Sequence, residues 1–154
     1  MRNDIFFYLK WLKFAEIFNE DELEILSEYF QEIRYNSKDK IYSKGTVGIG
    51  MGIIVRGQAE VSITESEGKI ILAKVGENET IGELSLLCDE PRSADVTAFG
   101  IVTLIVISKP KFEELFKEEP VIASKFLLQI TRILSQRIKN SNLQISKNYW
   151  RRNA

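Results

Sequence analysis

The sequence contains no histidine and only one cysteine in 154 residues. Without histidine the chain cannot form a Ser-His or Cys-His catalytic pair, a histidine-ligated zinc site or a histidine-ligated haem site. The single Cys88 cannot form an internal disulfide or hold an iron–sulfur cluster, and we expect it to be a small core residue in a reducing compartment. We therefore expect no metal, no cofactor and no enzymatic activity.

An excess of one charge and a long apolar run are also missing. The 21 basic residues nearly balance the 22 acidic residues, and the Arg151-Arg152 pair is too short to form a basic patch. No segment reaches the roughly 20 apolar residues of a membrane span, and Asp4 stands where a signal peptide carries only basic charge. We expect a soluble cytoplasmic protein that inserts into no membrane and binds no nucleic acid directly.

The chain is long enough for one sizeable hydrophobic core. A domain of this length buries about two thirds of the surface of its unfolded chain, so it needs no disulfide or metal to fold. No Pro/Ser-rich linker interrupts the sequence. We predict a single domain over 1–154, with N-terminal helices in 1–31, β-structure in 32–108 and C-terminal helices in 110–147.

Aromatic residues at three- and four-residue spacings predict a helical N-terminal region with a buried stripe. That stripe comprises Phe7, Trp11, Phe14, Ala15 and Phe18. Asn19 followed three residues later by Glu22 resembles a capping box, which predicts the start of a second helix.

Short β-branched runs separated by glycine fill the middle of the chain. They are Ile53–Val55, Glu60–Thr64, Lys69–Ala73 and Ile101–Ile107, with turn signals at Gly45, Gly57, Gly68, Gly76 and Gly100. This pattern predicts a sandwich or barrel of short antiparallel strands.

Helical periodicity returns after Pro110. It predicts a helix over Lys111–Lys117 and a long helix from Pro120 to about Lys147. The apolar stripe of the long helix comprises Leu127, Ile130, Leu134, Ile138 and Ile145, with the polar Ser141 as its irregular point near a fraying end. Such a stripe can pack on the β-structure, on a twin helix or on both.

Residues 81–96 break the strand pattern and predict a strand end, a short helix, a loop and a new strand. Gly82 permits close backbone approach, and the N–H groups of Glu83, Leu84 and Ser85 at the helix start favour an anion. The guanidinium of Arg92 and the neighbouring Ser93 hydroxyl can converge on the same anion.

The ligand of this cradle is limited by its single formal positive charge. Triphosphates usually need a P-loop lysine, Mg²⁺ or several basic groups, so a singly charged phosphodiester fits better. Glu83 could accept a hydrogen bond from a sugar hydroxyl beside that diester. The alternative is that Glu83 is an ordinary acid at a helix start, paired with Arg92.

The segment Gly82-Glu83-Leu84-Ser85-Leu86-Leu87, followed by Pro91-Arg92-Ser93-Ala94, resembles the phosphate-binding cassette of cyclic nucleotide-binding domains. These domains occur in bacterial catabolite activator proteins, protein kinase A regulatory subunits and gated channels, and the resemblance extends over nearly the whole chain. It implies a mainly β fold: a jelly-roll-like β-roll, or double-stranded β-helix, with N-terminal helices, a short cassette helix and a long C-terminal helix.

The resemblance also implies a role for each site residue. Arg92 would bind the phosphate oxygens, assisted by Ser93 and the Ser85 backbone, and Glu83 would bind the ribose 2′-hydroxyl. The ligand-binding residues expected on this basis are Gly82, Glu83, Leu84, Ser85, Arg92, Ser93 and Ala94, and, by analogy with a Thr-Ser pair that touches the base across a dimer, Ser141 and Asn142. The resemblance favours cAMP, and cGMP stays open because a hydroxyl after the arginine can contact guanine in related channels.

Three positions depart from the family pattern. Thr46 replaces a frequent acid and Gly52 a frequent aromatic residue, and Asp95 would weaken anion binding if its carboxylate faced the ligand. Family regulators continue into a helix-turn-helix domain, whereas this sequence stops at Ala154, so we expect a free-standing sensor or a fragment of a longer regulator.

The leading hypothesis is a non-enzymatic cyclic nucleotide sensor that signals through movement of its long helix to a partner or to an effector domain absent from this chain. The alternative is a ligand-free structural module that assembles as a homodimer through that helix. An enzyme would need a catalytic base, for which Glu83 is the one candidate in the cleft.

Overall fold

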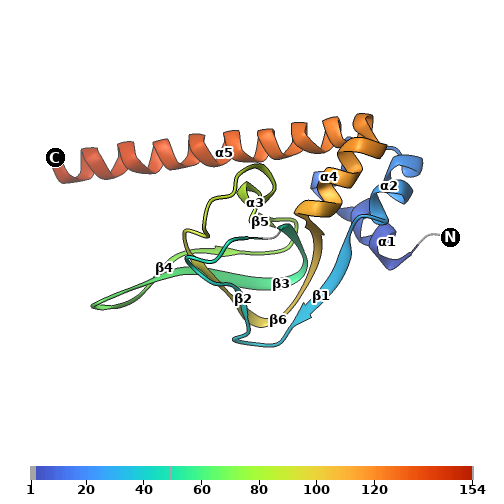
Figure 1. The fold of residues 1–154 in the computed structure, drawn as a ribbon. Coiled ribbons are helices and arrows are strands. Elements are labelled where there is room, and N and C mark those ends of the chain that lie inside the picture. The colour runs from blue at the N-terminus through green and yellow to red at the C-terminus, as the bar shows by residue number, and fades with distance from the viewer. Residues whose placement is uncertain (1–2, 49, 154) are drawn as a thin grey trace.

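Helices at both ends of the chain flank a six-stranded antiparallel sheet in the computed structural model, which describes residues 3–48 and 50–153 (Figure 1). The elements are α1 (Asp4–Trp11), η1 (Lys13–Ala15), α2 (Glu20–Ser27), β1 (Gln31–Tyr35), β2 (Lys40–Tyr42), β3 (Gly50–Glu65), β4 (Gly68–Val75), β5 (Thr80–Ile81), α3 (Leu84–Leu87), β6 (Asp95–Ser108), α4 (Lys109–Glu118) and α5 (Pro120–Asn153). The predicted mainly β fold with flanking helices is confirmed.

The strands β3 and β6 pair with each other and organise the sheet. β6 also pairs with β1 and β2, and β3 also pairs with β4 and β5. The pairing register of β3 and β6 shifts around Gly57, which has a positive φ of 92°. The runs predicted as separate strands on either side of Gly57 therefore form one long strand that bends at an irregularity.

The bent sheet encloses one of two hydrophobic clusters. This interior cluster consists of Ile41, Ile54, Ala59, Ile81, Val96, Ala98, Val102 and Leu104. The second cluster joins the N-terminal helices to α4, α5 and the other side of β3 and β6. At its centre the ring of Phe126 lies 4.8 Å from that of Phe14 and 5.4 Å from that of Phe112, so α5 is attached at its N-terminal end.

The predicted aromatic stripe of the first helices is only partly buried. Phe14, Ala15 and Phe18 are buried as expected, whereas Phe7 and Trp11 are 52% and 82% exposed. The helical spacing does not continue because α1 ends at Trp11 and the chain restarts as a 3₁₀ helix at Lys13. Phe6 and Leu9 form the buried face of α1 instead.

The capping box at the start of α2 is present as predicted. The Asn19 side chain accepts a hydrogen bond from the Glu22 N–H at 2.9 Å, and the Asn19 N–H donates to the Glu22 carboxylate at 3.0 Å. Cys88, expected in the core, is exposed.

The long helix α5 extends to Asn153, beyond the predicted end near Lys147. Its first half carries the buried Ile122, Phe126 and Ile130, and its second half contains no buried residue in the range 138–153. Ser141 lies within the continuous helix rather than at a frayed end. Among the described residues, no helix is both long and apolar enough to cross a membrane.

Candidate functional site

The cassette segment folds as a tight turn followed by a single turn of helix. Gly82, between β5 and α3, has a φ of 75°, a conformation that strains any residue with a side chain. Leu86 is buried and anchors α3, while Leu84 is exposed. The Ser85 N–H, expected to be a free donor for an anion, instead donates to the Gly82 carbonyl at 3.1 Å.

The backbone on either side of Arg92 is joined to the loop before β3. The Arg92 N–H donates to the Thr46 carbonyl, and the Gly45 N–H donates to the Arg92 carbonyl, both at 2.8 Å. A β-bridge between Val47 and Pro91 extends this pairing. These contacts hold the start of the Arg92 side chain beside the cassette helix.

The Arg92 side chain converges with Ser85 and Gly82 on one small space. A Cβ atom at Gly82 would stand 2.1 Å from Arg92 Nη1. A Cβ atom at Gly48 would stand 2.0 Å from Ser85 Oγ and 2.4 Å from Arg92 Nε. The structure thus brings the Ser85 hydroxyl beside Gly82 and the Arg92 guanidinium, whereas the hydroxyl that the sequence predicted to share an anion with Arg92 is that of Ser93.

A cavity of about 320 Å³ opens beside Arg92 and extends toward the interior of the sheet. Its lining includes Tyr35, Tyr42, Gly48 and Leu104 together with Arg92. This volume is at the lower end of the range for small-molecule sites.

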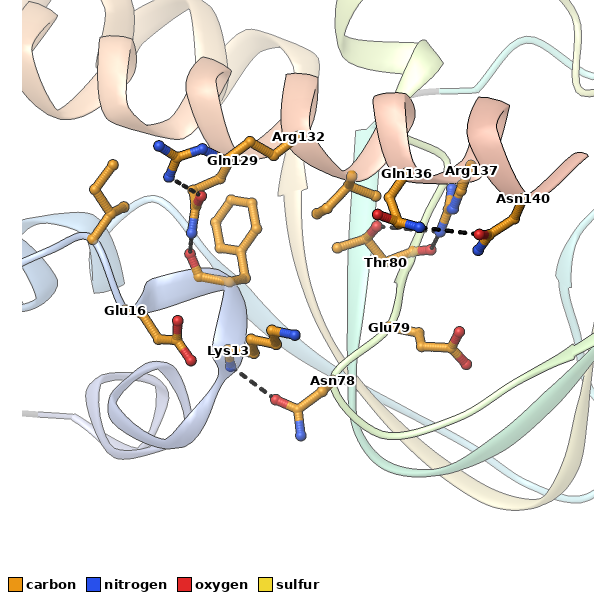
Figure 2. Close-up of a pocket in the computed structure, with 13 residues that line it drawn as sticks. Lys13, Glu16, Asn78, Glu79, Thr80, Gln129, Arg132, Gln136, Arg137 and Asn140 are labelled. Carbon is orange, nitrogen blue, oxygen red and sulfur yellow. Dashed lines mark hydrogen bonds between the residues drawn. The ribbon is translucent and has the colours of Figure 1, made fainter. Parts of the chain in front are cut away.

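Glu83 is buried and binds to α5 rather than to Arg92. Its carboxylate accepts a hydrogen bond from the Thr80 hydroxyl and pairs with Arg137 Nη1 at 2.6 Å. Arg137 Nη2 also donates to the Thr80 carbonyl at 2.6 Å (Figure 2). The expected alternative pairing of Glu83 with Arg92 is replaced by this cluster, which connects the cassette directly to the long helix.

A second cavity, of about 710 Å³, lies under α5 between η1 and the residues just before β5 (Figure 2). Gln129 Nε2 donates to the Phe14 carbonyl at 2.7 Å on the η1 side, and Arg137 contacts Thr80 on the other. Between these two polar contacts α5 passes over the cavity.

The Asp95 carboxylate contacts Lys40 at the start of β2 and Lys44 in the loop that follows β2. It accepts a hydrogen bond from the Lys44 N–H at 2.7 Å and lies 3.3 Å from Lys40 Nζ. The hydrogen bond from Lys44 and the charge of Lys40 lower the pKa of Asp95. Asp95 is thus paired with Lys40, and Glu83 with Arg137, rather than with the guanidinium of Arg92.

The remaining predicted site residues fall into two groups. Ser93 is exposed and Ala94 half-buried, directly after Arg92. Ser141 and Asn142 are exposed on α5 and, within 3–48 and 50–153, neither forms a hydrogen bond with the cassette. No group of three or more Cys, Asp or Glu residues in those same ranges is placed to hold a metal ion.

Sequence reasoning missed several residues that contact the predicted site, among them Tyr42, Thr80 and Arg137. The Tyr42 ring lies beneath the Arg92 guanidinium, with 3.6 Å between the guanidinium carbon and the ring centroid. A Cβ atom at Gly52 would stand 3.4 Å from the Tyr42 hydroxyl, so a large side chain at position 52 would meet Tyr42.

The family model and two curated relatives all point to the same protein family. Residues 32–119, more than half of the chain, match the family model described as "Cyclic nucleotide-binding domain". The chain is 25% identical over 126 residues to the cyclic AMP receptor protein of Thermus thermophilus, a match covering 81% of this chain and 56% of that protein. It is 31% identical over 108 residues to the cAMP-dependent protein kinase regulatory subunit of Debaryomyces hansenii, covering 70% of this chain and 23% of that protein.

A solved structure supports the same relationship. The crystal structure of a cyclic nucleotide-binding domain from Methylobacillus flagellatus superposes with a TM-score of 0.81 at 25% identity, covering 92% of this chain and 80% of that one. The chain thus matches an isolated domain over most of its length, and spans only about half or less of the two curated relatives.

Proposed function

Because the chain belongs to the cyclic nucleotide-binding domain family, we propose that it is a non-enzymatic regulatory domain that senses cAMP, with cGMP as the second candidate ligand. Two relatives, a cyclic AMP receptor protein and a cAMP-dependent protein kinase regulatory subunit, favour cAMP. The Ser93 hydroxyl beside Arg92 keeps cGMP as a candidate.

The observation that carries this proposal is the position of the Arg92 guanidinium in the cassette. Its guanidinium lies against Gly82 and beside Ser85 Oγ, while the carboxylates of Glu83 and Asp95 have cationic partners of their own. A single guanidinium matches the single negative charge of a cyclic phosphodiester, and a charge-assisted bidentate contact supplies both affinity and orientation.

Glu83 connects ligand binding to the long helix in this proposal. A ribose 2′-hydroxyl that donates to the Glu83 carboxylate would share that carboxylate with Arg137 and Thr80. Any change in the Glu83–Arg137 contact alters how α5 is held, because α5 beyond Arg137 carries no buried residue in the range 138–153. The ligand then shifts the population of α5 positions, and a partner or a linked effector domain reads the shift.

Isothermal titration calorimetry tests the proposal on protein refolded from denaturant to remove bound nucleotide. We expect saturable binding of cAMP, weaker binding of the dianionic 5′-AMP, and weaker binding of 2′-deoxy-cAMP if Glu83 receives the ribose hydroxyl. Arg92→Ala should weaken cAMP binding at least about 10-fold, as loss of a charge-assisted hydrogen bond implies.

The matched control removes the same charge from the exposed Arg34 on β1. Arg34→Ala should bind cAMP as the unmodified protein does. Equal affinity of Arg92→Ala and Arg34→Ala would refute the assignment, and silence with both cyclic nucleotides would favour the ligand-free module.

We also propose that the chain forms a homodimer through the second half of α5. Ile138, Ile145 and Tyr149 are 63%, 67% and 62% exposed, and their spacing places them on one face of the helix. A twin helix would cover this face and bring Ser141 and Asn142 close to a partner's cassette. Light scattering should give twice the monomer mass, and Ile138→Asp with Ile145→Asp should give the monomer.

Dimerisation also separates the two candidate functions. If the protein is a dimer and neither cAMP nor cGMP changes its melting temperature, the ligand-free module is supported. If the melting temperature rises with the concentration of cAMP or cGMP, the sensor is supported. No catalytic step is proposed, since Glu83, the candidate base, is paired with Arg137.

We propose that this regulatory role takes place in the cytoplasm.

A further inference from the structure

The guanidinium of Arg92 is enclosed by an aromatic ring and two glycines. The ring of Tyr42, at the end of β2, lies 3.6 Å from the guanidinium carbon. Positions 48 and 82 lack side chains, and a Cβ atom at either would stand 2.4 Å or less from a guanidinium nitrogen. The Gly50 carbonyl accepts a hydrogen bond from Arg92 Nη2 at 3.0 Å. The position of the guanidinium is therefore determined by three separate parts of the chain.

From this geometry, and resting on the proposed function, we infer that Tyr42 is the positioning residue for phosphate recognition by Arg92. Stacking uses the face of the guanidinium, whereas its N–H groups lie in the plane. The contact with Tyr42 thus orders a flexible side chain and leaves in-plane donors for a phosphodiester. An arginine ordered before the ligand arrives loses less conformational entropy on binding.

The ring rather than the hydroxyl of Tyr42 performs this role. The hydroxyl is buried and has no hydrogen-bond partner in the described parts of the chain. Burial raises the pKa of Tyr42 to about 12, and the nearby Arg92 guanidinium partly offsets that rise. The hydroxyl lies beside Gly52, where it would stand 3.4 Å from an added Cβ atom. Phenylalanine would keep the stacking face and remove a buried polar group without a partner, so Tyr42→Phe should not lower thermal stability.

The competing interpretation is that Tyr42 restrains Arg92 and opposes ligand binding. The two interpretations predict opposite signs. If the ring positions Arg92, replacing it with an aliphatic side chain weakens binding. If the ring restrains Arg92, the same replacement strengthens binding.

The test compares Tyr42→Leu with Tyr42→Phe by calorimetry with cAMP and cGMP. We expect Tyr42→Leu to bind about 2- to 30-fold more weakly, the range that a cation–π contact supports, and Tyr42→Phe to retain the affinity. In an Arg92→Ala background, Tyr42→Leu should produce no further loss, because the ring acts through the guanidinium. A merely structural role of Tyr42 would give the same loss in both backgrounds.

A second measurement needs no ligand. In proton–nitrogen NMR spectra the Arg92 Nε–H signal should shift on replacement of Tyr42 by leucine, because the ring current is lost, and should stay near its original position in Tyr42→Phe. Unchanged or tighter binding by Tyr42→Leu would overturn the inference alone. A native protein that binds no cyclic nucleotide would overturn both this inference and the proposed function.

Discussion

The ion pair between Glu83 and Arg137 predicts that Arg137→Met and Glu83→Gln, which both remove it, lower the stability of the domain by unequal amounts. Glu83 is almost completely buried, with a side chain 5% exposed, whereas the Arg137 side chain is 44% exposed. Replacing Arg137 with methionine leaves a buried carboxylate with only the Thr80 hydroxyl as its partner. Replacing Glu83 with glutamine leaves an arginine that water can solvate.

The magnitudes follow from this difference in burial. Removing one partner of a fully buried pair costs about 3–5 kcal/mol, and a hydrogen bond to a charged group contributes about 1.5–3 kcal/mol. Since water reaches Arg137, we expect Arg137→Met to destabilise the domain by about 2 kcal/mol, a value within the range for a hydrogen bond to a charged group and below the range for a fully buried pair. Glu83→Gln should cost less than about 1 kcal/mol. For a domain of this size the first value corresponds to a melting temperature lower by about 4–8 °C.

Urea unfolding followed by far-ultraviolet circular dichroism measures both values. Methionine and arginine have similar helix propensities, so the comparison reports the lost contact rather than helix formation. The matched control is Arg132→Met, since Arg132 is an exposed residue of the same helix that donates to Gln129 at 3.2 Å. We expect this control to lie within about 0.5 kcal/mol of the unmodified protein.

Two results would refute the reasoning. If Arg137→Met and Arg132→Met unfolded at the same urea concentration, the cluster would contribute nothing to holding α5. If Glu83→Gln destabilised the domain more than Arg137→Met, the argument from burial would be wrong. A double-mutant cycle over Glu83 and Arg137 gives the coupling energy directly.

Two further predictions concern the cassette and its supporting loop. Gly82→Ala and Gly100→Ala both place a side chain at positive φ, 75° and 77°, and each should lower stability by about 1–2 kcal/mol. Only Gly82→Ala should also weaken cAMP binding, because its Cβ would displace Arg92, whereas nothing lies within 4 Å of a Cβ at Gly100; equal affinities in calorimetry would contradict this. Asp95→Asn should lower stability at pH 7, because the substitution removes the contacts of the charged carboxylate. The stability difference between the unmodified protein and Asp95→Asn should shrink as pH falls through the lowered pKa of Asp95, because protonation then removes the same stabilisation from the unmodified protein. A stability difference that stays constant with pH in thermal melts would exclude this role for the carboxylate.

Local features of the fold could be predicted because their causes lie within a few residues. The capping box joins Asn19 to Glu22, Pro120 begins α5, and Gly68 turns the β3–β4 hairpin with a φ of 127°. The cassette could be predicted for the same reason, because Gly82, Glu83 and Ser85 act over a single turn of chain. The prediction failed at Phe7 and Trp11, where a break after α1 changed which face of the helix is buried.

Short-range spacing was enough to predict the order of helices, β-structure and helices and the turn and short helix of the cassette. The long-range contacts became visible in the fold: Tyr42 lies under Arg92, Arg137 pairs with Glu83, and Lys40 pairs with Asp95. Each of these pairs joins residues about 50 positions apart in the sequence. The contacts of Tyr42 and Lys40 depend on how β2 pairs with β6, and the contact of Arg137 depends on how α5 packs over the cassette. A one-residue change in register would turn a side chain to the opposite face of the sheet, which is why no local pattern could predict these partners.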